Sequence, residues 1–338
     1  MAVDIRLHVR NELNALSEEV ADLAEALLAF GETYRKIPLV GRTHLQPAMP
    51  SSVGMWASAY AEMLLDDGYL LEAAAKVNNL CPLGSAAGYG VPLPIDRQLT
   101  SDLLAFDRPH HNVFYASCAR GKDEAVLLAA CAQIMLSLSR LAEDLILFSM
   151  PEFRYFTLPR DLCTGSSIMP QKYNPDVLEL IRGKAALLLG QSTAANVILK
   201  AMPGGYNRDL QDTKELYMEG LRVTRTSLRI MKLMAENLKV NPEACRAAFA
   251  EPGVFATDRA LELVAGGMPF RDAYHQVRDH LEDLRGMDPD EVIAKKTHLG
   301  GTNGIDFAAL RGRAEAFRAQ AAAAQARVDA AFASLMNV

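Results

Sequence analysis

Apolar side chains return at helical spacing along the first part of the chain. Between residues 4 and 35 they recur every three or four positions, and the first glycine is Gly31. This periodicity predicts one long amphipathic helix over residues 4–35. The positions that define it are Ile5, Val9, Leu13, Leu16, Val20, Leu23 and Leu27.

Four further long helices follow from the same kind of pattern. After a proline-containing loop over residues 39–52, Ser51 or Ser52 can cap a helix that reaches roughly residue 78. The segment 116–150 is apolar on nearly every face, which is typical of a helix buried by neighbours on all sides. The other two helices are expected at roughly 176–200 and 207–238, with a Pro-Gly-Gly break between them.

The pattern changes near residue 240, where proline and glycine breaks become frequent. We therefore predict a central helical bundle over residues 1–239 and a small helical C-terminal domain over residues 240–338. Its helices are expected at 255–264, at 269–283 and, in the alanine-rich end of the chain, at 307–336. No segment of useful length has strand periodicity and no internal repeat is found, so the predicted fold class is all-α.

Composition narrows the function classes. Half of the 338 residues are apolar, the net charge is −6, and long Lys/Arg runs are absent, which argues against nucleic-acid or membrane-surface binding. The most apolar window, 125–139, stops at Arg140 and is shorter than a bilayer span. Five scattered cysteines indicate neither a disulfide framework nor a zinc site, and the charged N-terminus does not resemble a signal peptide. A cytoplasmic location is expected.

The densest cluster of reactive side chains lies between Gly165 and Asp176. Glycine and two serines predict a flexible loop, and Pro175 followed by acidic residues favours a helix start. Lys172 and Asn174 add a charge and amide donors beside that helix start, a combination that can hold a substrate carboxylate. The alternative is a serine-rich surface loop that caps a helix.

This segment resembles the signature of the fumarase/aspartase superfamily of lyases, and its Gln-Lys-x-Asn-Pro-Asp form is most similar to argininosuccinate lyases. Three further segments resemble the same family. They are Thr43-His44-x-Gln46-Pro47, Pro94-x-Asp96-Arg97, and the Tyr206, Gln211 and Lys214 spacing. The resemblance implies a long helical bundle and the reversible elimination of arginine from argininosuccinate to give fumarate, with no metal or organic cofactor.

The resemblance also assigns roles to individual residues. Ser166 is expected to be the catalytic base, and His44, oriented by Glu179, is expected to assist at the leaving group. The expected substrate-binding residues are Thr43, Gln46, Arg97, Ser167, Lys172, Asn174, Tyr206, Gln211 and Lys214. In the family three subunits of a homotetramer contribute to each active site, so the same assembly is expected here.

Each motif also has an ordinary structural interpretation. A lone loop histidine such as His44 is more often structural, and a polar helix end such as 206–215 is often simply solvated. Gly84, Gly88 and Gly90 do not follow a strand or precede Gly-Lys-Ser/Thr, so we interpret them as a tight turn and not as a phosphate loop.

Several positions depart from the family pattern. Residues 119–123 differ from the usual Ser-x-Arg-Asp, and Tyr173 stands where many relatives have lysine. The family's Ser-Arg-Asn-Asp region and N-terminal domain have no counterpart before Asp4. We expect that the start is misplaced, that the protein is a truncated relative, or that a separate chain supplies this part. The chain alone is expected to turn over argininosuccinate poorly.

Two other functions remain open. One is another fumarate-releasing lyase such as an adenylosuccinate lyase, although Gln171 and the Tyr206, Gln211 and Lys214 set count against it. The other is a truncated homologue without catalytic activity.

Overall fold

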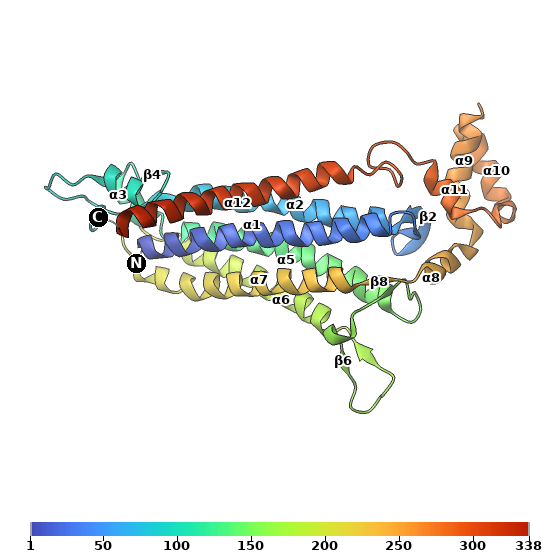
Figure 1. The fold of residues 1–338 in the computed structure, drawn as a ribbon, viewed down its shortest axis with the longest axis horizontal. Helices are drawn as coiled ribbons and strands as arrows, with labels where there is room; N and C mark the ends of the chain where they lie inside the picture. Colours follow the sequence, from blue (N-terminus) through green and yellow to red (C-terminus); the bar gives the residue numbers. More distant parts are fainter. Residues whose placement is uncertain (1, 337–338) are drawn as a thin grey trace.

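The computed structural model describes residues 2–336 and shows an elongated bundle of long helices (Figure 1). The all-α class is confirmed. Neighbouring helices pack along most of their lengths, with α1 against α2, α5 against α6, and α7 against both α1 and α5. The long helices are α1 (Ala2–Thr33), α2 (Val53–Asn78), α5 (Lys122–Ser149), α6 (Asp176–Leu199), α7 (Thr213–Asn237) and α12 (Phe307–Met336).

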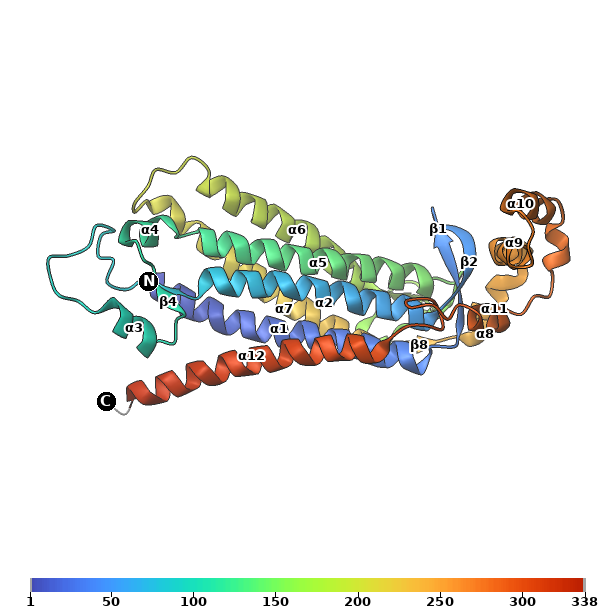
Figure 2. The ribbon, with the colours of Figure 1, turned by 90° about the horizontal axis from the view of Figure 1, so that it is seen from above.

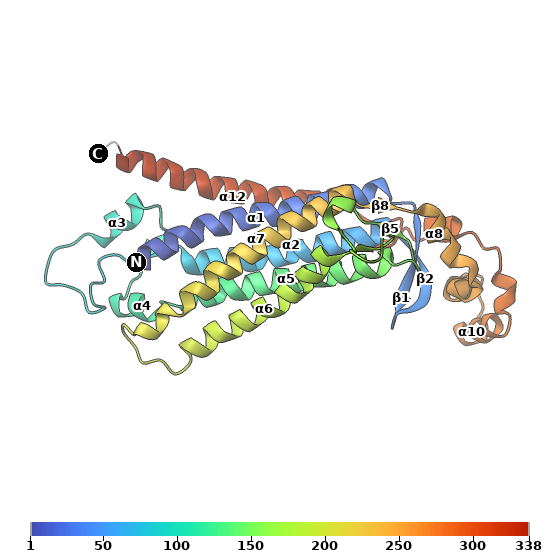
Figure 3. The ribbon, with the colours of Figure 1, turned by 90° about the horizontal axis from the view of Figure 1, so that it is seen from below.

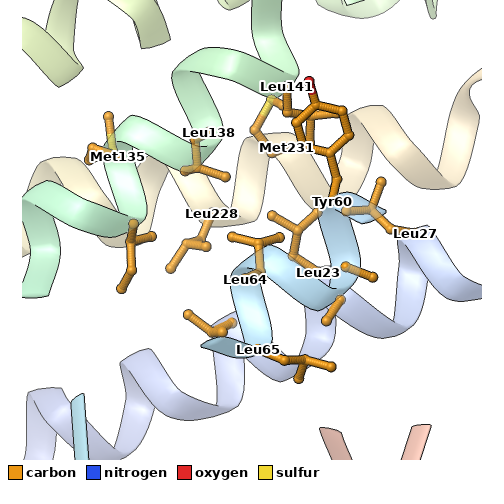
Figure 4. Close-up of a cluster of buried hydrophobic side chains, with 14 of the residues drawn as sticks. Leu23, Leu27, Tyr60, Leu64, Leu65, Met135, Leu138, Leu141, Leu228 and Met231 are labelled. Atoms are coloured by element: carbon orange, nitrogen blue, oxygen red, sulfur yellow. The ribbon is translucent and has the colours of Figure 1, made fainter. Parts of the chain in front are cut away.

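The bundle core is built from buried apolar side chains of all six long helices, and Figure 4 shows the part of it that lies between α1, α2, α5 and α7. The apolar stripe predicted from residues 4–35 faces this core, and its members Leu16 and Leu23 are fully buried. Removing such a side chain from water stabilises the fold by roughly 1.5–3 kcal/mol. Figure 4 labels Leu23, Leu27, Tyr60, Leu64, Leu65, Met135, Leu138, Leu141, Leu228 and Met231.

Helix α5 is the most apolar of the long helices. By length and composition it can cross a membrane, which corrects the length argument made from residues 125–139. However, 67% of its apolar window is buried inside the bundle. Packing against α2, α6 and α7 therefore accounts for its apolar character, as the sequence predicted.

The single helix predicted over 116–150 is wrong at its start. The segment forms a short helix, α4 (Val113–Cys118), and then α5. Gly121 between them has a φ of 79°, a left-handed conformation that glycine adopts at little cost. A β-carbon at Gly121 would meet Leu199 and Leu210 at 2.5 and 2.7 Å, so the chain turns there against the end of α6 and the segment just before α7.

The loop predicted over residues 39–52 is a β-hairpin, so the expectation that the chain has no strands is also wrong. Strand β1 (Pro38–Thr43) pairs with β2 (Gln46–Ser52) in antiparallel register. His44 and Leu45 form the two-residue turn with φ of 53° and 62°, the positive values that a type I′ turn requires. The hydroxyl of Ser52 accepts a hydrogen bond from the Met55 amide at 3.1 Å, which confirms Ser52 as the cap of α2.

Short elements complete the bundle. The predicted helix 207–238 begins as a 3-10 turn, η2 (Arg208–Gln211), and α3 (Arg97–Leu103) follows the Gly-rich loop. Three pairs of two-residue strands connect loops by backbone hydrogen bonds. They are β3 (Leu80–Cys81) with β4 (Arg108–Pro109), β5 (Phe156–Thr157) with β8 (Lys239–Val240), and β6 (Thr164–Gly165) with β7 (Tyr173–Asn174).

Residues after 240 divide between two places (Figure 2). One group of short helices builds a separate apolar core around Phe255, beyond the hairpin, and also packs on Val40 of β1. In contrast, α12 returns along the bundle, and its Phe307 and Phe317 join the main core. The domain boundary at residue 240 stays a prediction. The short helices are α8 (Pro242–Ala247), α9 (Ala256–Ala265), α10 (Phe270–Asp279) and α11 (Pro289–Ala294).

Candidate active site

The candidate site residues fall into two groups at opposite ends of the bundle (Figure 3). We call the end that carries residues 38–52 and 164–179 the hairpin end, and the end that carries residues 82–121 and 200–214 the far end. Helix α6 starts at the hairpin end and finishes at the far end. Its 24 residues span about 36 Å at 1.5 Å per residue.

At the hairpin end, the signature segment forms a projecting loop between β6 and β7 (Figure 1). The Ser166 hydroxyl oxygen accepts hydrogen bonds from the amides of Ile168 at 3.3 Å and Met169 at 3.0 Å. The loop closes at its base, where the Thr164 hydroxyl donates to Asp176 and lowers the pKa of that carboxyl. The Ser166 oxygen therefore lies in a turn where two backbone N–H groups point toward it.

The remaining signature side chains face solvent. Ser167 and Lys172 are exposed, and Asn174 is half-buried. The apolar tip residue Ile168 is 86% exposed, which is unusual for a large aliphatic side chain. Within residues 2–336 the tip of this loop is therefore open to water.

The hairpin carries Thr43, His44 and Gln46, all of them exposed. Arg42 supports its turn, because its guanidinium donates to the Leu45 carbonyl at 2.9 Å and to the Tyr155 hydroxyl at 3.3 Å. The same guanidinium stacks on the Phe153 ring, 4.8 Å from its centroid. Sequence reasoning missed Arg42, although it directly precedes the Thr-His motif.

Two cavities flank the hairpin. His44 lines one of ≈ 640 Å³ together with Asp144 and Phe148. Thr43 lines the other, of ≈ 720 Å³, between the hairpin and the C-terminal helices. Thr43 ends a strand and His44 begins the turn, and the hairpin thus presents these two candidate residues to different cavities.

The predicted pair of His44 and Glu179 does not form within this chain. Glu179 lies in the exposed first turn of α6, and among residues 2–336 it makes no hydrogen bond or ion pair with His44. The backbone offers a reason, since the hairpin and the signature loop leave the bundle in different directions (Figures 1 and 3).

At the far end, Arg97 is held by main-chain carbonyls. Its guanidinium donates to Leu83 at 2.9 Å and to His110 at 2.7 Å, and one of its terminal nitrogens is buried without a partner. Gly84 makes room for it, since a β-carbon there would lie 2.8 Å from the Arg97 side chain. In this chain Arg97 therefore ties the Gly-rich loop to the segment before α4.

The structure does bring Gln211 and Lys214 together. The Lys214 ammonium donates to the Gln211 side-chain oxygen at 2.5 Å, and both residues are half-buried at the start of α7. Tyr206 is 63% exposed, and the Arg120 guanidinium lies 4.7 Å from its ring centroid. Within the described part of the chain, no group of three or more His, Cys, Asp or Glu side chains is arranged to hold a metal ion.

Comparison with known proteins agrees with this architecture. A family described as Lyase matches residues 1–190. Argininosuccinate lyase of Phocaeicola vulgatus is 42% identical over 278 residues, which cover 81% of this chain and 61% of that protein. Argininosuccinate lyase of Thermotoga neapolitana is 41% identical over 280 residues, or 81% and 69% of the two chains.

Solved structures show the same fold. EDDS lyase in complex with formate matches with a TM-score of 0.88 at 24% identity, over 98% of this chain and 74% of that one. A class II fumarase from Schistosoma mansoni matches with a TM-score of 0.70 at 18% identity, over 85% and 68%. These structures show the fold, and the family match and the argininosuccinate lyase relatives identify it as that of the fumarase/aspartase superfamily of lyases.

Within that superfamily the chain belongs to the argininosuccinate lyase family. The chain spans about three-fifths of the length of the first curated relatives that it matches.

Proposed function

We propose that the chain is a subunit of a lyase that eliminates arginine from argininosuccinate to give fumarate. The proposal is supported by family membership and by the signature side chains that the family pattern assigns to this chemistry. The structural observation that carries it is the Ser166 oxygen, which accepts two backbone N–H bonds.

The chemistry needs a base for a weakly acidic C–H bond, an anion clamp and an acid. Ser166 is proposed to take the proton, and the amides of Ile168 and Met169 would stabilise the negative charge that its oxygen needs. Lys172 and Asn174 would hold the carboxylate on which charge develops. Thr43, Gln46 and Ser167 would bind the fumarate half, and His44 would assist at the leaving nitrogen.

An active site of this kind requires several subunits. The two groups of residues are separated by the length of α6, so no single chain can place them around one small molecule. Exposed aliphatic side chains on α6 favour packing against another subunit, among them Leu180 at 60% and Leu187 at 69% exposure. We propose a homotetramer with composite active sites, in which Glu179 of one subunit can reach His44 of another.

The cytoplasmic location also stays a proposal. It is supported by the five cysteines, all of which are free thiols.

The test is the Ser166→Ala variant. Fumarate release from argininosuccinate should fall by roughly 10²–10⁴-fold, the usual contribution of a positioned base, while helical circular dichroism stays unchanged. Ser149→Ala, which alters a hydroxyl bonded to its own helix, is the matched control and should keep full activity. Retention of more than about a tenth of the rate by Ser166→Ala would show that another group is the base.

A further inference from the structure

Arg120 stands where the sequence departs from the family pattern, immediately before the Gly121 turn. Its guanidinium lies over the Tyr206 ring at 4.7 Å, and Tyr206 is a proposed substrate-binding residue. The α4–α5 joint that carries Arg120 packs against the α6–α7 connection, and Figure 2 shows both at the far end. Arg120 is therefore placed beside the proposed binding residues by the fold and not by sequence proximity.

The donors of this guanidinium are unused. An arginine has five N–H donors, and within residues 2–336 those of Arg120 form no hydrogen bond or ion pair. Glu124, one turn further along α5, is buried and forms no ion pair with Arg120. The face of the guanidinium is thus occupied by an aromatic ring while its edge is left for a ligand.

Its neighbours continue the same site. Gly121 is in near contact with Leu210, and the next residue, Gln211, accepts the hydrogen bond from Lys214. The result is a surface with two cations, an amide and a phenol, contributed by the α4–α5 joint, the connection after α6, η2 and α7. A surface of this composition favours a planar anion, and a guanidinium binds a carboxylate in bidentate fashion.

We propose that Arg120 binds the α-carboxylate of the leaving amino acid. The inference rests on the proposed function, in which Tyr206, Gln211 and Lys214 contact the half of the substrate that leaves as arginine. That half carries a guanidinium, an ammonium and one carboxylate, and only the carboxylate attracts a cation. Arg120 therefore selects an amine that bears a carboxylate, and its stacking on Tyr206 fixes the plane of its donors.

The test compares two amines in the reverse reaction with fumarate, namely arginine and agmatine, which is arginine without its carboxylate. Wild-type protein should prefer arginine over agmatine. In Arg120→Met, kcat/KM for arginine should fall roughly 10–100-fold, the loss expected for charge-assisted hydrogen bonds, while the value for agmatine stays unchanged. Arg120→Lys should recover part of the preference, because lysine keeps the charge but loses the planar fork.

Lys122→Met is the matched control, because Lys122 also lies near an aromatic ring, that of Tyr115 at 5.8 Å, but two positions away. It should leave both amines unaffected. An equal loss for arginine and agmatine in Arg120→Met would assign Arg120 a structural role and overturn the inference, as would no loss at all. If the wild type adds the guanidino group of neither arginine nor agmatine to fumarate, the proposed function itself fails, a result distinct from either.

Discussion

Asp67 is a buried carboxyl in the middle of the bundle, on α2. It is 5% exposed and accepts a hydrogen bond from Ser137 of α5 at 2.6 Å. Burial raises its pKa to about 6, and the nearby charge of Asp66 adds to the effect. The folded protein therefore holds this proton at pH values where the unfolded chain, with an ordinary aspartate pKa, has released it.

The sign of the linkage follows from that difference. Between about pH 4 and pH 6 the folded state binds more protons, so stability from this group falls as pH rises and is lost above pH 6. A shift of this size corresponds to about 3 kcal/mol. Asp67→Asn removes the buried charge and should raise the free energy of unfolding by roughly 1–3 kcal/mol at pH 7.5, with little gain at pH 4.

Urea unfolding at both pH values measures this prediction. Asp66→Asn, which changes an exposed carboxyl paired with Arg313, is the control and should change the free energy of unfolding by less than about 1 kcal/mol at pH 7.5. An Asp67→Asn variant that is equally destabilised at both pH values would mean that the hydrogen bond to Ser137 outweighs the buried charge.

At the scale of elements, the joint between α4 and α5 sets the position of the far end. Gly121→Ala requires a β-carbon in the left-handed region and in collision with Leu199 and Leu210. We expect a loss of at least about 1–2 kcal/mol in unfolding free energy, measured by urea titration. Gly183→Ala, inside α6 with open space around it, should instead stabilise by roughly 0.5–1 kcal/mol. Equal effects would show that the Gly121 conformation is not needed.

The elements also show what sequence can predict. Apart from the starts of α5 and α7, the ends of the long helices were predicted within two residues, because each helix has a continuous apolar face, as α1 does from Val9 to Leu28. The hairpin was missed because prolines such as Pro47 and Pro50 are unusual in strands and because apolar and polar residues do not alternate along it. Both strands of a two-stranded ribbon are edge strands, and proline is tolerated there. The break at Gly121 was missed because apolar residues continue on both sides of it.

The candidate site was only half predictable for a related reason. Motifs identified residue types, and Gln211 and Lys214 are indeed in contact. The motifs do not show which segments lie at the same end of the bundle. Only the structure therefore shows that Ser166 is far from Tyr206 and that Arg120 contacts Tyr206. The buried pair of Arg6 and Asp123, at 2.6 Å between two helices, was missed because the two residues are distant in sequence.

At the scale of the molecule, the proposed composite site predicts that two inactive variants can restore each other. Ser166→Ala disables the hairpin end and Gln211→Ala the far end. If each site takes these residues from different subunits, a random mixture of the two chains leaves about one quarter of the sites intact. Mixed subunits, refolded together or coexpressed, should therefore regain about a quarter of wild-type activity.

Each variant refolded alone is the control and should stay inactive. A mixture with no recovered activity, despite mixed oligomers in native mass spectrometry, would place both residues in sites built by one chain.

Helix α12 lies along the bundle, and a row of its arginines forms ion pairs with acidic side chains of α1, α2 and the loop before α4. Its apolar contacts recur at helical spacing, and its buried side chains include Phe307, Leu310, Ala314 and Phe317, the last of which would meet a β-carbon at Gly68. Residues 295–306 connect α12 to the short helices. The helix therefore resembles a peptide ligand that is tethered to its own bundle, and a short flexible connection gives such a ligand a millimolar effective concentration. Salt screens such ion pairs, so raising the ionic strength should weaken the attachment of α12, while its buried apolar side chains continue to hold it on the bundle. The row comprises Arg311, Arg313, Arg318 and Arg327.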